Sequence, residues 1–204
     1  MIKRYLFTFA LVLSLSCAAL YGINVKANAT GSDSEPGAVG SVVADFKLPD
    51  LDGREQSLSS LKGKNGTVLI FVGVQCPVSN AYNERMEKLA QDYRARGVNV
   101  VGVNANSTES ASDAKAHATS NNLTFPILKD NGNKLADKLG AERTPEAYVL
   151  DSSNKIIYRG RIDNARNPSS VSASELRDAL EAMLAGKPVA KSSVPAFGCT
   201  IKRG

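Results

Sequence analysis

The sequence predicts an α/β fold in which a central mixed sheet carries helices on both faces. Apolar strand-like runs alternate with helix-like segments in the first part of the chain, which favours parallel pairing of the early strands. Two closely spaced runs at 147–150 and 155–158 predict an antiparallel pair, because only the turn 151–154 separates them. The chain has 204 residues, enough for one core of this size with extensions.

The early elements follow from hydrophobic patterning. Residues 45–48 form a short predicted strand, which a turn at Asp52-Gly53 ends. Residues 67–74 are a continuous run of β-branched and apolar side chains, typical of a strand buried on both faces. A helix over 77–96 is predicted by apolar residues at helical spacing and ends at Gly97.

The later elements are predicted in the same way. Residues 98–103 repeat the buried-strand pattern, and two polar helices are expected at 108–121 and 133–139. After the antiparallel pair, leucines at four-residue spacing predict a last helix over 174–184.

The N-terminal 29 residues have the order of a secretory signal peptide. A basic start at Lys3-Arg4 precedes the apolar run 5–20, and Ala27-Asn28-Ala29 is a small-x-small cleavage pattern. We therefore expect an exported, periplasmic or extracellular protein. A membrane-tethered form stays open, either through a retained anchor or through Cys17 as a lipoprotein cysteine.

The rest of the chain divides into three predicted parts. Residues 30–41 are small, polar and glycine-rich and are expected to be a flexible arm. The folded domain is expected over 42–186, and residues 187–204 form a tail that carries Cys199. Removing residues 1–29 takes out three basic residues and no acids, so the formal charge falls from +5 to +2. No basic run interleaves with aromatic residues, and we expect no nucleic-acid partner.

Cys76 is the leading candidate for chemistry. It follows the buried strand and precedes Pro77, a residue suited to the first turn of a helix. A thiol at a helix start has a lowered pKa, because unpaired N–H groups and the helix dipole favour the thiolate. The alternative is an inert cysteine that packs as a small apolar side chain. Ser79 stands three residues on, where its hydroxyl is either a hydrogen-bond donor to the sulfur or an ordinary polar group of a helix start.

A second candidate feature is Thr144-Pro145, which leads into the strand at 147–150. A proline in that position can adopt the cis form, although out of context an ordinary edge-strand proline is the favoured interpretation.

Together these features resemble the thioredoxin superfamily. The resemblance covers about residues 42–186 and rests on Val74-Gln75-Cys76-Pro77, Thr144-Pro145 and the segment 158–163. Within the superfamily the chain is most similar to the redoxin group, and in particular to exported peroxiredoxin-like proteins with a Gly-Cys-x-Ile-Lys tail, here residues 198–202. The resemblance implies a thioredoxin-like fold and an antioxidant or thiol-disulfide oxidoreductase activity with Cys76 as redox nucleophile and Thr144 and Pro145 facing it.

Two departures from the peroxiredoxin pattern bear on activity. Gly73 stands where those proteins have Thr or Ser, and Pro145 stands where they have an Arg. The main hypothesis is therefore an exported thiol-disulfide oxidoreductase. The alternatives are a peroxiredoxin-like peroxidase and a redox-inert binding domain.

Cys199 is the candidate partner of Cys76, because Ser79 replaces the second cysteine of an ordinary thioredoxin motif. The ten or so residues before Cys199 can extend about 30 Å, so a Cys76–Cys199 pair is within reach. A redox pair, a structural bridge and two unpaired thiols all remain open. We expect no metal or other cofactor, because one histidine and one local cysteine are poor ligands for a soft metal. The expected partners are protein thiols or disulfides, a small thiol or a peroxide, and an external thiol reductant.

Overall fold

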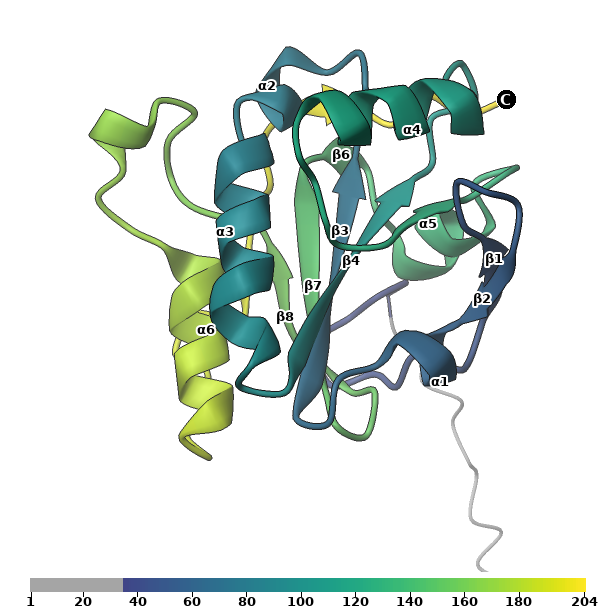
Figure 1. Ribbon diagram of the computed structural model, residues 1–204. Coiled ribbons are helices and arrows are strands. Elements are labelled where there is room, and N and C mark those ends of the chain that lie inside the picture. The colour runs from purple at the N-terminus through teal and green to yellow at the C-terminus, as the bar shows by residue number, and fades with distance from the viewer. Residues whose placement is uncertain (1–34) are drawn as a thin grey trace, which may run out of the picture. The chain divides into compact units, whose positions relative to one another are not determined.

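A computed structural model describes residues 35–204 (Figure 1). The predicted signal peptide, residues 1–29, lies outside the described residues, as does the first part of the predicted arm. In residues 35–204 no helix combines the length and the apolar character needed to cross a membrane.

A six-stranded mixed sheet organises the fold, with the strand order β5-β4-β3-β7-β8-β9. The strands β3 and β4 pair in parallel, as do β4 and β5, whereas β7 is antiparallel to both β3 and β8. The predicted mixed sheet and the predicted antiparallel pair are therefore confirmed. The strands of this sheet are β3 (Gly66–Val72), β4 (Val98–Asn104), β5 (Ile127–Lys129), β7 (Glu146–Asp151), β8 (Ile156–Gly160) and β9 (Ser193–Val194).

Two short two-stranded ladders complete the strand pairing. The strands β1 (Lys47–Pro49) and β2 (Glu55–Ser57) form a hairpin, and β6 (Arg143–Thr144) pairs with β10 (Cys199–Thr200). The helices are α1 (Leu58–Leu61), α2 (Pro77–Asn80), α3 (Asn83–Arg94), α4 (Ala111–Ser120), α5 (Lys134–Leu139), α6 (Glu175–Leu184) and the 3₁₀ turn η1 (Pro168–Ser170).

Helices cover both faces of the sheet, as expected for this fold class. On one face, Met86 and Leu89 of α3 and Leu176 of α6 pack against alternate side chains of β3 and its neighbours. On the other face, α1 and α5 pack with the remaining side chains of the same strands, such as Phe71. Because side chains alternate along a strand, the fully buried β3 contributes to both layers, which explains its uninterrupted apolar sequence.

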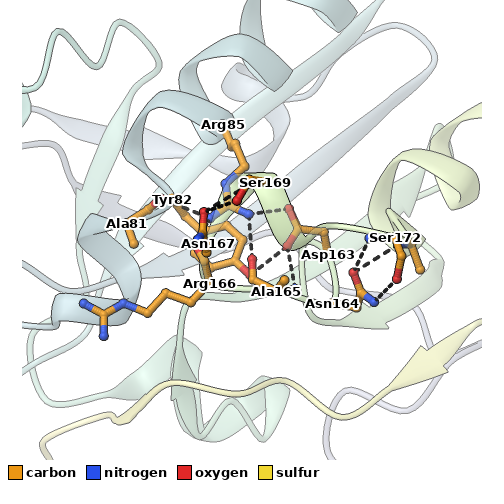
Figure 2. A network of polar contacts seen from close by, with 11 residues as sticks. Ala81, Tyr82, Arg85, Asp163, Asn164, Ala165, Arg166, Asn167, Ser169 and Ser172 are labelled. Carbon is orange, nitrogen blue, oxygen red and sulfur yellow. Dashed lines mark hydrogen bonds and ion pairs between the residues drawn. The ribbon is translucent and has the colours of Figure 1, made fainter.

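One predicted helix is wrong in its extent. The segment 77–96 forms two helices, α2 and α3, which separate at Ala81 and Tyr82. The guanidinium of Arg85 donates to the Ala81 carbonyl at 3.1 Å, and the Tyr82 hydroxyl donates to Asp163 at 2.8 Å. The Tyr82 bond joins the break to the loop after β8, and Arg85 pairs with Asp163 of the same loop (Figure 2), so long-range contacts hold an interruption that local periodicity does not predict.

Candidate functional site

Cys76 lies at the end of β3, where its side chain caps the short helix α2. Its Sγ accepts a hydrogen bond from the Ser79 backbone N–H at 3.2 Å and donates one to the Thr144 carbonyl at 3.1 Å. The residue is only 3% exposed. The sequence prediction placed Cys76 at a helix start, and the structure has it there.

Pro77 and Ser79 shape the turn around the sulfur. Pro77 occupies the first turn of α2, where its missing N–H costs nothing. The Ser79 hydroxyl is not the donor to Cys76, contrary to one of the two alternatives from the sequence: it accepts a hydrogen bond from the Gly73 N–H at 3.2 Å, and the donor to the sulfur is the Ser79 backbone N–H. Ser79 therefore fixes the loop before Cys76 as well as the sulfur itself.

Thr144 and Pro145 face Cys76 across the site. The peptide bond between them is cis, and Thr144 is fully buried. The Thr144 hydroxyl oxygen finds no hydrogen-bond partner at ordinary distance among residues 35–204. The Thr144 hydroxyl nevertheless lies near Cys76 and favours its thiolate form. A Cys76 thiolate would give this hydroxyl a hydrogen-bond acceptor.

The tail brings Cys199 to the same place. In the β6–β10 ladder Cys199 stands opposite Thr144, whose carbonyl also accepts from Cys76. Gly198 permits this approach, since a Cβ there would lie 2.0 Å from the Thr144 carbonyl oxygen. The side chains of Cys199 and Cys76 are near enough for each to shift the pKa of the other, and both are free thiols. Two residues separated by 123 positions are thus neighbours.

Anchors on the C-terminal side of Cys199 hold the tail. The Ile201 side chain is 2% exposed and belongs to the apolar cluster that α5 covers. Its N–H donates to the Glu142 carbonyl at 2.9 Å, and the Lys202 N–H donates to Asn106 Oδ1 at 2.8 Å. The Arg203 guanidinium donates to Asp137 and to the Ala141 carbonyl. The tail is therefore part of the folded domain.

A second contact holds the tail on the other side of Cys199. Phe197 packs against Tyr82 in an edge arrangement, with ring centroids 6.3 Å apart. Tyr82 is fixed in turn by Asp163, which also pairs with Arg85 at 2.7 Å (Figure 2). The Arg85–Asp163 ion pair and the Tyr82–Phe197 contact together hold the segment before Cys199. These contacts were not among those predicted from the sequence.

The two thiols have opposite pKa shifts. Burial raises the pKa of Cys76, but the neighbouring side chains of Cys199 and Thr144 and the hydrogen bond from the Ser79 N–H outweigh it and lower that pKa. Burial raises the pKa of Cys199, and the neighbouring Cys76 raises it further. Of the two thiols, Cys76 is therefore the one that loses its proton more readily.

A buried carboxylate positions the loop before Cys76. Glu109 accepts hydrogen bonds from the Val74 N–H at 3.0 Å and the Gln75 N–H at 2.9 Å, and from the Asn104 side chain. Burial raises the pKa of Glu109, but these bonds lower it more. Behind it, the Lys129 ammonium donates to Asn104 Oδ1 at 2.7 Å, and burial lowers the pKa of this lysine.

Sequence analysis did not select this polar cluster. One signal was present, because Asn104 ends the strand next to β3, and the carboxyl ends of adjacent parallel strands share an edge.

Gly73 is closely surrounded. A Cβ at this position would lie 2.9 Å from Asn106 Nδ2 and 3.1 Å from both Cys76 Cβ and Thr144 Oγ1. The threonine or serine of the peroxiredoxin pattern would therefore collide with the site unless Asn106 moved. Gly73 therefore fits a site that contains the two cysteines and lacks the threonine or serine hydroxyl of the peroxiredoxin pattern.

His117 lies closer to the site than its sequence position suggested. Its Nε2 is 3.0 Å from Asn80 Oδ1 and 3.3 Å from Asn83 Nδ2, so it links α4 to the helices that follow Cys76. Burial lowers its pKa. Within residues 35–204 no three His, Cys, Asp or Glu side chains gather as a metal site would require.

The comparisons with known proteins agree with this geometry. The sequence profile described as the AhpC/TSA family matches residues 39–159. The thiol-disulfide oxidoreductase ResA of Geobacillus thermodenitrificans is 32% identical over 145 residues, which are 71% of this chain and 80% of the relative. ResA of Bacillus thuringiensis is 28% identical over 155 residues, 76% of this chain and 86% of the relative.

A solved structure shares the fold as well. A hypothetical protein of Sinorhizobium meliloti superposes with a TM-score of 0.76 at 32% identity, over 82% of this chain and 95% of its own. The described domain has the thioredoxin-like fold that the sequence resemblance implied. With a family profile that spans more than half of its length, the chain belongs to the AhpC/TSA family.

Proposed function

We propose that this protein is an exported thiol-disulfide oxidoreductase whose redox centre is the pair Cys76 and Cys199. The observation that carries the proposal is that two free thiols lie beside the same residue: Cys199 is paired with Thr144, and Cys76 donates to the Thr144 carbonyl. The pKa of Cys76 is lowered and that of Cys199 is raised. Such a pair matches the requirements of disulfide exchange, which needs a thiolate and a second thiol within reach.

The reaction follows from these positions. In the reduced protein the Cys76 thiolate attacks a substrate disulfide, forms a mixed disulfide and releases one substrate thiolate. Cys199 then loses its proton and attacks the Cys76 sulfur, which releases the second substrate thiolate and leaves a Cys76–Cys199 bridge. The substrate gains two electrons, and an external thiol reductant returns the bridge to two thiols.

The remaining residues support this role. The Ser79 N–H and the Thr144 hydroxyl favour the Cys76 thiolate, Pro145 shapes the facing wall, and Pro77 sets the turn. The relatives named ResA are thiol-disulfide oxidoreductases by their names, which supports a thiol or disulfide substrate for this chain. Export is supported by the pattern of residues 1–29.

A peroxidase function receives less support from the site. The crowded Gly73 lacks the hydroxyl that the peroxiredoxin pattern supplies at that position, and Pro145 lacks its guanidinium. A redox-inert binding domain is also less favoured, because an inert domain gives no reason for two free thiols beside the same residue.

The test is a disulfide reductase assay with oxidised glutathione as substrate and dithiothreitol as donor. We expect the wild-type protein to accelerate the reaction, Cys76→Ser to abolish the acceleration, and Cys199→Ser to accumulate a mixed disulfide at Cys76. An unchanged rate in Cys76→Ser would contradict the proposal. Ser59→Ala, a change at an exposed position of α1, serves as the control.

A further inference from the structure

A buried polar cluster lies where the parallel strands β4 and β5 end. Each of its members is at most 5% exposed, and the cluster consists of Asn104, Asn106, Glu109 and Lys129. Removing an acid and an ammonium from water costs free energy unless hydrogen bonds compensate for it. Contacts lead from this cluster to both of the segments that carry the cysteines.

One set of contacts holds the tail. The Asn106 side-chain oxygen Oδ1 accepts a hydrogen bond from the Lys202 N–H at 2.8 Å, and the Ser107 N–H donates to the Lys202 carbonyl at 2.9 Å. Both backbone groups of Lys202 are thus bonded to two successive residues that follow β4. This attachment lies three residues beyond Cys199.

The other set holds the loop before Cys76. Nδ2 of the same Asn106 side chain lies 2.9 Å from the place where a Cβ of Gly73 would stand. The Asn106 side chain also helps to lower the pKa of Glu109, whose carboxylate accepts from the two N–H groups that directly precede Cys76. One amide side chain therefore faces the tail with its oxygen and the Cys76 loop with its nitrogen.

The backbone of Asn106 is itself fixed. Its carbonyl accepts hydrogen bonds from the Lys129 ammonium at 2.7 Å and from the Glu109 N–H at 3.2 Å. The same ammonium donates to Asn104 Oδ1 at the end of β4. The buried lysine thus ties Asn106 to the ends of two strands, and the amide has a rigid support.

Resting on the proposed function, we propose that Asn106 is a positioning residue of the redox pair, which couples the Cys76 loop to the tail that carries Cys199. The exchange that this coupling serves is the closure of the bridge. The Cys199 thiolate bonds to the Cys76 sulfur of a mixed disulfide, and the substrate sulfur leaves with the electron pair as a thiolate. Each bond that holds Cys199 beside Cys76 favours closure, because the tail then loses less freedom in forming the bridge.

The experiment measures how well Cys199 competes with glutathione for the Cys76 sulfur. The full chain is equilibrated with glutathione buffers, quenched with acid and alkylated, and its cysteine peptides are quantified by mass spectrometry. The readout is the ratio of bridged protein to Cys76–glutathione adduct at a fixed concentration of reduced glutathione. A residue that only stabilises the fold lowers the melting temperature without changing this ratio.

Two sites give matched variants. Lys202→Pro lacks the N–H that Asn106 accepts, whereas Lys202→Ala keeps it, and both lose the same ammonium. We expect the ratio in Lys202→Pro to be about threefold to tenfold below that in Lys202→Ala, which is the size of one lost hydrogen bond. Asn106→Ala should lower the ratio further, because it also removes Nδ2 from the Cys76 loop. Adding Lys202→Pro to Asn106→Ala should change nothing more, since both remove the same bond.

The outcomes separate the inference from the proposed function. A wild-type ratio in Asn106→Ala overturns the inference, and equal effects of Asn106→Ala and Lys202→Pro reduce Asn106 to a tail anchor and overturn the coupling. If Asn106→Ala does not fold, Asn106→Asp replaces it: this variant keeps the acceptor for Lys202 and exchanges only Nδ2 for an oxygen beside Glu109. A lowered ratio in Asn106→Asp then supports the coupling, and an unchanged ratio overturns it. A wild-type protein that forms no Cys76–Cys199 bridge contradicts the proposed function itself.

Discussion

Ile201→Ala tests whether the anchored tail is what brings Cys199 to Cys76. Ile201 is almost completely buried, and truncation of such a side chain costs about 2–5 kcal/mol. We expect the lower end, because Ile201 lies near the chain end, where the tail can readjust. The loss falls mainly on the docked tail, since the rest of the cluster belongs to strands and helices that pack without it.

The expected size of the effect on bridging follows from the equilibrium between a docked and a released tail. A loss of about 2 kcal/mol changes that equilibrium by about thirtyfold, because about 1.4 kcal/mol corresponds to a factor of ten. The effective concentration of Cys199 at Cys76 falls by up to the same factor, because a released tail spends most of its time away from the site.

The assay is equilibration with glutathione redox buffers, followed by acid quench, alkylation and measurement of the bridged fraction. Ile201→Ala should need a more oxidising buffer to reach half-bridging. We expect the effective concentration of Cys199 at Cys76 to fall by about tenfold to thirtyfold. Leu135→Ala is the matched control, since Leu135 is equally buried in the same cluster but lies on α5. The reasoning is refuted if both variants lose stability while the bridging equilibrium of Ile201→Ala stays at the wild-type value.

Three further predictions concern the surroundings of Cys76. Gly73→Ala should lower the free energy of unfolding in urea by about 1–3 kcal/mol, because the added Cβ meets Asn106; unchanged stability would show that the pocket is roomier. Glu109→Gln should cost about 1–3 kcal/mol at neutral pH, because an amide donor would face a backbone N–H donor. Because folding lowers the pKa of Glu109, its contribution to stability is present above the ordinary glutamate pKa and is lost as pH falls through the folded pKa. The melting temperatures of Glu109→Gln and wild type should therefore converge in acid. Cys199→Ala should raise the pKa of Cys76, read from thiolate absorbance, because a neighbouring side chain that lowers this pKa is removed; a lower pKa would contradict the assigned effect.

Part of the fold was predictable because its signals are local. The buried strand β3 has an unbroken apolar sequence, and the helices α3 and α6 show apolar spacing with terminating residues. By contrast, the ladder of β6 and β10 has two residues in each strand and is held by pairs that lie 55 and 57 positions apart in the sequence. No periodic pattern marks a strand of that length.

The candidate site likewise contains some residues that could be predicted from the sequence and others that could not. Cys76 was predictable from the junction of strand, proline and helix, and Thr144-Pro145 from its position before a strand. Glu109 and Lys129 were not selected, because an acid in a polar segment and a base at the end of a short strand resemble solvated side chains until the fold buries them. The pairing of Cys199 with Cys76 was only one of three open alternatives, since chain length permits the pair but does not require it.

The central claim is that Cys76 and Cys199 form a reversible redox pair in the folded protein. The most direct measurement is a redox titration with glutathione buffers, in which alkylated and bridged tryptic peptides are quantified at each potential. We predict a single two-electron transition in which the bridged peptide pair replaces the two alkylated peptides, and rapid reversal by dithiothreitol under native conditions. Separate alkylation of both cysteines at every potential would contradict the account, as would a bridge that dithiothreitol reduces only after unfolding.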